Sequence, residues 1–324
     1  MEPQRFVFVL GTGRCGSTLV HEVLARHPDV GFISNLDNRF PGLGLKGRLN
    51  GPLYRALPGP VSGFTTTGSV AGWGAPVDHD ATAPKLSVAG RMMRRFGPAE
   101  AYDLIERRVS IVVRRPERDL TAEDARGELG GGFRRFFLER ARAQRRPVFV
   151  HHFTGWPRAR FVQEALPGAR FVHVVRDGRA VASSLLRASW WRGHHGTDGW
   201  GFWPLPPEYE REWEASGRSK PVLAGLQWKL LMDAFDQARR AVPEDHWLEV
   251  RFEDLVAAPR EGVARMLAFA GLGWTDRFER QFARTVFRPG RRDAYMHELG
   301  PGGVALLEQS LGDHLRRHGY ARVG

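Results

Sequence analysis

The sequence predicts an α/β fold in which helices cover both faces of a central parallel β-sheet. The chain has 324 residues, of which 42% are hydrophobic and 26% charged, as is ordinary for a folded globular protein. Short apolar segments typical of buried strands alternate with amphipathic helical segments, which favours parallel strands joined by helical crossovers. The sequence contains no internal repeat. We therefore expect a single domain spanning residues 1–324.

The first crossover is predicted close to the N-terminus. Residues 5–10 (RFVFVL) form an uninterrupted apolar run typical of a buried strand. Residues 17–27 have helical apolar spacing and end at Pro28, and residues 29–34 predict a second strand. From residue 36 to residue 146 the pattern is irregular and rich in glycine. Such a long irregular region in a compact domain is usually either functional or disordered.

Regular alternation returns at residue 147. We expect strands at 148–151, 170–175 and 246–251, and helices at 133–144, 158–166, 179–187, 222–240, 259–270 and 304–318. A second irregular stretch, residues 190–219, contains five tryptophans. Core packing and a lid over a ligand are both compatible with these tryptophans.

Composition limits the function classes. Basic residues exceed acidic ones by 48 to 36, which favours an anionic partner, although only four of the 48 are lysines, a bias also typical of GC-rich genomes. A single cysteine, Cys15, excludes an intrachain disulfide and a cysteine metal cage. The apolar runs are too short to span a bilayer, so we expect no transmembrane segment and a cytoplasmic location. The oligomeric state is not predictable from these features.

A glycine-rich loop follows the first strand and precedes the first helix. We call residues 11–18 the glycine-rich loop; it comprises Gly11, Thr12, Gly13, Arg14, Cys15, Gly16, Ser17 and Thr18. In this context backbone N–H groups and the start of a helix converge on an anion. A nucleotide P-loop would have lysine where Ser17 stands, and no convincing acidic Mg²⁺ ligand follows. We therefore expect Arg14 and backbone donors to bind an anion without a metal.

A second anion-binding element follows the strand at 170–175. This strand ends at Arg176, and Ser184 lies eight residues further along the following helix. The carboxyl edge of a parallel sheet is where open α/β folds bind ligands. A guanidinium and a hydroxyl at this edge form a second oxyanion site.

Together the two elements resemble the sulfotransferase superfamily, whose members use 3′-phosphoadenosine 5′-phosphosulfate (PAPS). The resemblance implies a P-loop-like three-layer α/β/α fold. It also implies that the glycine-rich loop holds the 5′-phosphosulfate, and that Arg176 and Ser184 hold the 3′-phosphate. Residues 248–255 (LEVRFEDL) resemble the family's L-x-V-R-Y-E-D-L, with Phe252 in place of tyrosine, and residues 311–320 are similar to the ends of many bacterial members.

The resemblance also implies catalytic roles. Arg14 is expected to stabilise charge on the leaving group. His152, near the end of the strand before Arg176, and Asp37, after the second strand, are alternative general bases. Because successive strand residues face opposite sides, only one of His151 and His152 can point into the cleft. The acceptor is expected to be a hydroxyl or amine of a small molecule, glycan or lipid, bound by residues 36–146 and 190–219, which form the acceptor site and its lid.

Two other functions stay open at this point. One is a small-molecule kinase with a degenerate P-loop, which the missing lysine disfavours. The other is a non-catalytic basic protein that binds nucleic acid, but the sequence has no recognisable nucleic-acid-binding motif. We therefore expect no nucleic-acid partner.

Overall fold

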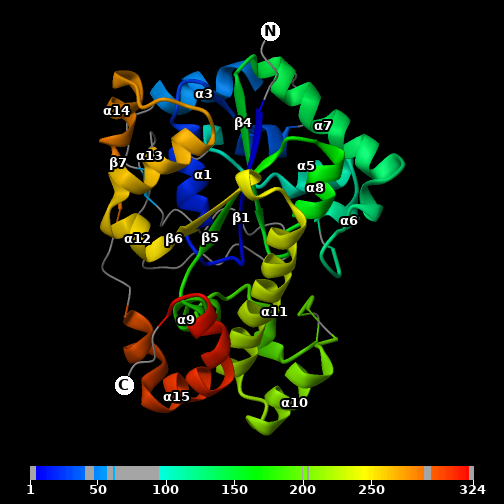
Figure 1. The fold of residues 1–324 in the computed structure, drawn as a ribbon, viewed down its shortest axis with the longest axis vertical. Helices are drawn as coiled ribbons and strands as arrows, with labels where there is room; N and C mark the ends of the chain where they lie inside the picture. The colour runs from blue at the N-terminus through cyan, green and yellow to red at the C-terminus, as the bar shows by residue number, and fades with distance from the viewer. Residues whose placement is uncertain are drawn as a thin grey trace.

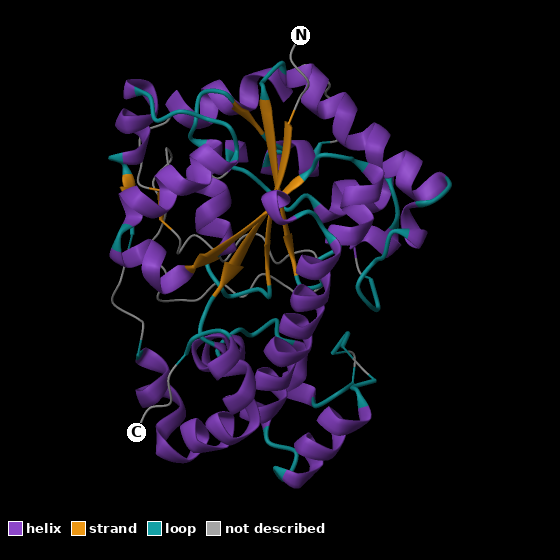
Figure 2. Ribbon diagram, in the orientation of Figure 1, coloured by secondary structure: helices purple, strands orange, loops and turns teal. Residues whose placement is uncertain are grey.

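The molecule contains a five-stranded parallel sheet with helices on both faces, which confirms the predicted fold class (Figures 1 and 2). The computed structural model describes residues 5–40, 47–56, 61–62, 95–114, 116–198, 200–202, 204–287 and 293–320. The strands are β1 (Arg5–Gly11), β2 (Val30–Gly31), β4 (Val148–Thr154), β5 (Arg170–Val175) and β6 (Trp247–Arg251), in the order β2-β4-β1-β5-β6. A separate parallel pair joins β3 (Val61–Ser62) to β7 (Thr285–Val286).

The helices connect and cover these strands. They are α1 (Ser17–Ala25), α2 (Asn35–Arg39), α3 (Gly47–Ala56), α5 (Tyr102–Arg108), α6 (Ile111–Arg114), α7 (Glu128–Gln144), α8 (Ala159–Ala165), α9 (Gly178–Leu186), α10 (Pro207–Ala215), α11 (Lys220–Ala241), α12 (Phe252–Ala257), α13 (Pro259–Phe269), α14 (Asp276–Phe282) and α15 (Ala294–Arg317). No helix among the described residues is long and apolar enough to cross a membrane.

The central strand β1 divides the core into two layers. Phe6, Phe8 and Leu10 pack with residues of α7, α8 and α11 on one face. Val7 and Val9 pack with residues of α1 and α13 on the other. This alternation explains the uninterrupted apolar run of the sequence, because a strand covered on both faces has no solvent-facing side.

The carboxyl ends of the strands face a helical layer made by α9, α15 and the first half of α11 (Figure 1). The tryptophans of residues 190–219 contribute to this layer. Trp191 and Trp200 are buried, and both indole N–H groups donate to Oε1 of Gln227 on α11, at 2.8 and 3.1 Å. Trp203 lies outside the described residues. These two side chains therefore serve as core.

Candidate functional site

The glycine-rich loop turns sharply between β1 and α1. Gly13, Arg14 and Gly16 all have positive φ, at 85°, 57° and 93°. A Cβ on Gly16 would lie 2.2 Å from Cδ2 of Phe252, so this side chain packs directly against the loop backbone. Gly16 is also the N-cap of α1, where no side chain occupies the first N–H groups of the helix. These donors are available for an anion at the carboxyl edge of the sheet.

The second element meets this loop. Arg176, which follows β5, donates from Nη1 to the backbone oxygen of Arg14 at 2.9 Å. Arg14 donates from Nε to Oγ of Ser184 on α9, also at 2.9 Å. Arg14 and Ser184 are 170 positions apart in sequence. The three side chains predicted to bind an anion therefore lie together in the structure.

The two guanidinium groups create a largely buried region of positive charge. Burial lowers the pKa of both arginines, and the neighbouring charges of Arg176 and then Arg187 lower that of Arg14 further. Within the described part of the chain, neither Arg14 nor Arg176 lies within 4.0 Å of a carboxylate oxygen. An anion bound here would relieve this repulsion.

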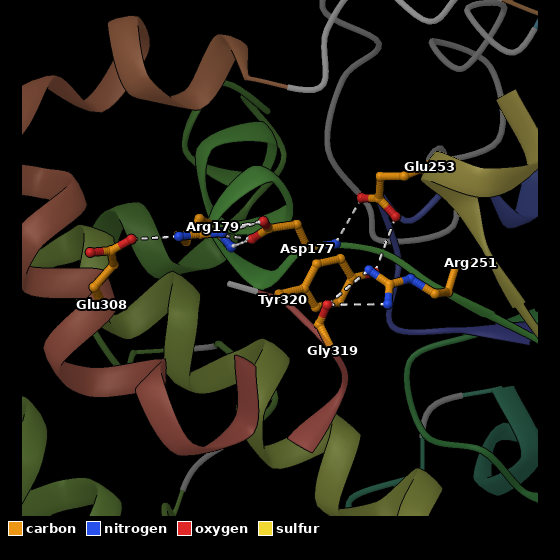
Figure 3. Close-up of polar contacts among 7 residues, drawn as sticks. All are labelled: Asp177, Arg179, Arg251, Glu253, Glu308, Gly319 and Tyr320. Carbon is orange, nitrogen blue, oxygen red and sulfur yellow. Dashed lines mark hydrogen bonds and ion pairs between the residues drawn. The ribbon is translucent and has the colours of Figure 1, made fainter. Parts of the chain in front are cut away.

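A polar network around Asp177, the residue that follows Arg176, fixes the direction of the turn (Figure 3). Asp177 caps α9 by accepting from the backbone N–H of Arg179 at 2.8 Å. Its own backbone N–H donates to Oε1 of Glu253 at 3.1 Å, and Tyr320 donates to Oε2 of the same carboxylate at 3.1 Å. Burial raises the pKa of Tyr320, so the phenol remains a donor. The motif at 248–255 and the C-terminal segment thus both support the second element.

His152 lies directly beneath the glycine-rich loop. Its Nε2 is 2.8 Å from Oγ of Ser17, and its Nδ1 is 3.3 Å from Oε1 of Glu100. His151 points to the opposite face of the sheet, against Phe137, as strand alternation predicts. Burial lowers the pKa of both histidines well below the usual value, and it lowers that of the adjacent His21 to about 3. We call His21, His151 and His152 the histidine cluster.

Asp37 lies at the start of α2 and has a local role. Its Oδ2 accepts from the backbone N–H of Ser34 and from Oγ of Ser34, both at 3.0 Å, and from the side-chain amide of Asn50. The backbone N–H of Asp37 donates in return to Oγ of Ser34 at 3.1 Å, and this reciprocal pair of Ser34 and Asp37 is the capping box of α2. The described hydrogen bonds of Asp37 do not include one to the glycine-rich loop.

Glu100 is the site residue that sequence reasoning missed. It lies in the irregular region 36–146, where no motif or period singles it out. In the structure it contacts His152 and accepts from Oγ1 of Thr154 at 3.1 Å. Burial raises its pKa to about 7. Within the ranges that the structure describes, no group of three or more metal-binding side chains comes together.

Comparisons with protein families, curated proteins and solved structures all identify sulfotransferases as similar to this chain. A model of the "Sulfotransferase family" matches residues 77–276. Two curated proteins, the omega-hydroxy-beta-dihydromenaquinone-9 sulfotransferases Stf3 of Mycobacterium bovis and Mycobacterium tuberculosis, are each 22% identical over 185 residues. That match covers 55% of this chain and only 42% of each relative. The crystal structure of the sulfotransferase STF9 from Mycobacterium avium is similar in fold, with a TM-score of 0.56 and 15% identity, over 99% of this chain and 78% of that one.

Proposed function

The chain belongs to the sulfotransferase family, and from that membership we propose that it transfers a sulfuryl group from PAPS to a hydroxyl or amine. The observation that carries the proposal is the convergence of Arg14, Arg176 and Ser184 beside the free N-terminus of α1. This arrangement offers two neighbouring anion sites, as a donor with separate 5′ and 3′ anionic groups requires.

We assign each anionic group of the donor to one element. The glycine-rich loop and the start of α1 bind the 5′-phosphosulfate through backbone N–H groups. Arg176 and Ser184 bind the 3′-phosphate. Phe252 packs between the two elements, with the Arg176 guanidinium carbon 5.0 Å from its ring centroid. It therefore keeps the spacing of the two anion sites constant.

Sulfuryl transfer places specific demands on the chain. A bond forms between the acceptor oxygen and sulfur, while the bond from sulfur to the bridging phosphate oxygen breaks. Negative charge then develops on the leaving phosphate, and Arg14 is the cation closest to the loop that would bind it. A fixed guanidinium stabilises such charge without reorganisation at the moment of reaction.

The acceptor class follows from the family and the surrounding segments. The curated relatives are named as sulfotransferases of omega-hydroxy-beta-dihydromenaquinone-9. We propose a hydroxyl or amine of a small molecule, glycan or lipid for this chain, bound by parts of residues 36–146 and 190–219 within the same domain.

Ligand-induced thermal stabilisation tests the donor assignment. Adenosine 3′,5′-bisphosphate at about 100 times its dissociation constant should stabilise the protein by about 2.7 kcal/mol without added metal. Adenosine 5′-phosphate, which lacks the 3′ group, should stabilise it much less. Equal shifts with both nucleotides, or a requirement for Mg²⁺, would contradict the proposal. A larger shift with ATP and Mg²⁺ would favour a kinase, and a larger shift with DNA a nucleic-acid-binding protein.

A further inference from the structure

A continuous line of polar contacts leads from the glycine-rich loop to Glu100: two hydrogen bonds and then a close approach of His152 to the carboxylate. The Cys15 thiol donates to Oγ of Ser17 at 3.5 Å, and that oxygen lies 2.8 Å from Nε2 of His152. On the other side of the ring, Nδ1 lies 3.3 Å from Oε1 of Glu100. Every group on this line has a partner, and the line ends at a carboxylate.

The backbone places Glu100 at the carboxyl edge of the sheet. Beyond β2 the chain leaves the parallel pairing, and Ser34 forms an antiparallel bridge with Pro98. The backbone N–H of Ala99 donates to the oxygen of Ile33 at 2.8 Å. This short pairing brings Glu100 against Thr154, which is the last residue of β4 and lies opposite Gly11 in the β1–β4 register. Glu100 therefore contacts the last residue of the strand that pairs with the start of the loop.

Arg158, whose charge acts on Glu100, donates its hydrogen bonds to backbone oxygens of other residues. Arg158 donates from Nε to the oxygen of Val113 at 3.0 Å and from Nη1 to the oxygen of Trp156 at 2.6 Å. The Tyr102 hydroxyl accepts from the backbone N–H of Thr154 at 2.9 Å. Glu100 is thus held by hydrogen bonds from neutral groups and by the distant charge of Arg158. Because burial outweighs these contacts, its pKa rises to about 7.

Exposure separates Glu100 from His152. The side chain of Glu100 keeps 13% of its surface accessible, whereas that of His152 keeps 1%. Both ring nitrogens of His152 have partners, and its pKa lies well below the ordinary value because of burial and the neighbouring His21. An acceptor reaching the loop would meet the carboxylate without breaking any contact of the imidazole.

We propose that Glu100 is the general base of the reaction and that His152 is a positioning residue, which holds Glu100 through Nδ1 and the glycine-rich loop through Nε2. The inference rests on the proposed sulfuryl transfer. The acceptor O–H bond breaks and its proton passes to a carboxylate oxygen of Glu100 as the oxygen–sulfur bond forms. The electron pair of the breaking sulfur–oxygen bond goes to the leaving phosphate, and Glu100 later returns its proton to solvent.

The first test is spectroscopic and needs no acceptor. Infrared difference spectra of the wild-type protein between pH 5.5 and 8.5 should contain a protonated-carboxyl band that titrates near pH 7. The Glu100→Gln variant should lack this band, and Asp37→Asn, the matched control at the rival carboxylate, should keep it. Absence of a band that depends on Glu100 would overturn the proposal.

The second test measures transfer of labelled sulfate from PAPS to water and to 1-decanol as a probe alcohol. Wild-type turnover should rise with pH through about 7, because the ionised carboxylate is the active form. Glu100→Gln should lose about 10²- to 10⁴-fold in turnover and the rising limb of the pH profile. His152→Asn should keep a rising limb with a shifted midpoint. Turnover within threefold of wild type in Glu100→Gln, or an equal loss in Asp37→Asn, would refute the assignment.

Measurements of donor binding distinguish a failure of the proposed function from a failure of the Glu100 assignment. Glu100→Gln and Asp37→Asn should keep the wild-type thermal shift with adenosine 3′,5′-bisphosphate, since no described contact joins either residue to the glycine-rich loop, Arg176 or Ser184. His152→Asn removes a contact to Ser17 of that loop, so this variant is compared only by its pH profile. Absence of any thermal stabilisation of the wild-type protein by this nucleotide would refute the proposed function. Normal nucleotide binding with unchanged turnover in Glu100→Gln would refute only the role of Glu100.

Discussion

Replacing Gly16 by alanine should damage the donor site through two separable effects. The first is conformational, because Gly16 has a φ of 93°, and the left-handed region costs a residue with a Cβ about 1–2 kcal/mol. The second is steric, because the new Cβ would lie 2.2 Å from Cδ2 and 2.4 Å from Cε2 of Phe252. Forcing a methyl group into a packed position costs about 1–3 kcal/mol. We expect Gly16→Ala to lower the free energy of unfolding by about 2–5 kcal/mol.

Gly13 provides the matched control. Its φ of 85° carries the same conformational cost, but a Cβ there would have nothing within 4 Å. Urea unfolding should therefore show a loss of about 1–2 kcal/mol for Gly13→Ala. In a Phe252→Ala background, adding Gly16→Ala should cost no more than Gly13→Ala does, since the clash is gone. Equal losses for the two glycine variants in the wild-type background would refute the packing argument.

Three further predictions concern charge and hydrogen bonding around the same site. Arg176→Ala should mainly weaken binding of adenosine 3′,5′-bisphosphate, whereas Arg14→Ala should lower single-turnover rates at saturating PAPS, because Arg14 belongs to the loop proposed to bind the 5′-phosphosulfate; normal turnover in Arg14→Ala would remove its catalytic role. The histidine cluster has folded-state pKa values below the ordinary 6.5, so the folded state binds fewer protons than the unfolded one and stability falls as the pH drops below 6.5. Each histidine should cost about 1.4 kcal/mol between pH 7.5 and 5.5 in urea unfolding, and His151→Leu should reduce the pH dependence by that amount. Tyr320→Phe leaves an oxygen of the buried Glu253 without its donor and should cost about 1–3 kcal/mol of unfolding free energy, with weaker nucleotide binding; a variant as stable as wild type would contradict this role.

The contact between the two anion-binding elements was predictable because its determinants are local. The glycine-rich loop joins a strand to the next helix within eight residues, and Arg176 directly follows a strand. Parallel strands bring their carboxyl ends to one edge, so a correct assignment of β1 and β5 already places the two elements side by side. Their contact at 2.9 Å is therefore a consequence of register and not of a long-range signal.

The acceptor side was not predictable in the same way. Glu100 reaches the edge of the sheet only through the antiparallel bridge between Ser34 and Pro98, which are 64 positions apart and share no sequence pattern. The strand expected at 29–34 proves shorter for the same reason, since parallel pairing stops at Gly31. Local periodicity carries no information about such a contact.

The start of the last helix was also not predictable from local sequence. The last helix was expected at 304–318 because Val304, Leu307, Leu311 and Leu315 have helical spacing and share one face. The structure begins α15 at Ala294, and Gly300 has a φ of 67° where two helical segments meet at a kink. A positive φ at glycine followed by proline allows the chain to change direction there without leaving the helical layer. The sequence prediction therefore described the second segment and omitted the first.

The two buried guanidinium groups of the site destabilise the free protein, and this bears on how the neighbouring carboxylate is used. Arg14 and Arg176 are both largely withdrawn from water, each with a lowered pKa, and the charge of one lowers the pKa of the other. Glu253 is the carboxylate that most raises the pKa of Arg176, and its two oxygens also accept from the backbone N–H of Asp177 and from the Tyr320 hydroxyl. The carboxylate therefore supports the turn, while burial still leaves the pKa of Arg176 below its usual value. Since an unpaired buried charge destabilises the free protein, an anion that neutralises it gains affinity from the same free energy. The network in Figure 3 holds the turn in place while the site remains positive, which is the condition under which a doubly anionic donor binds most strongly.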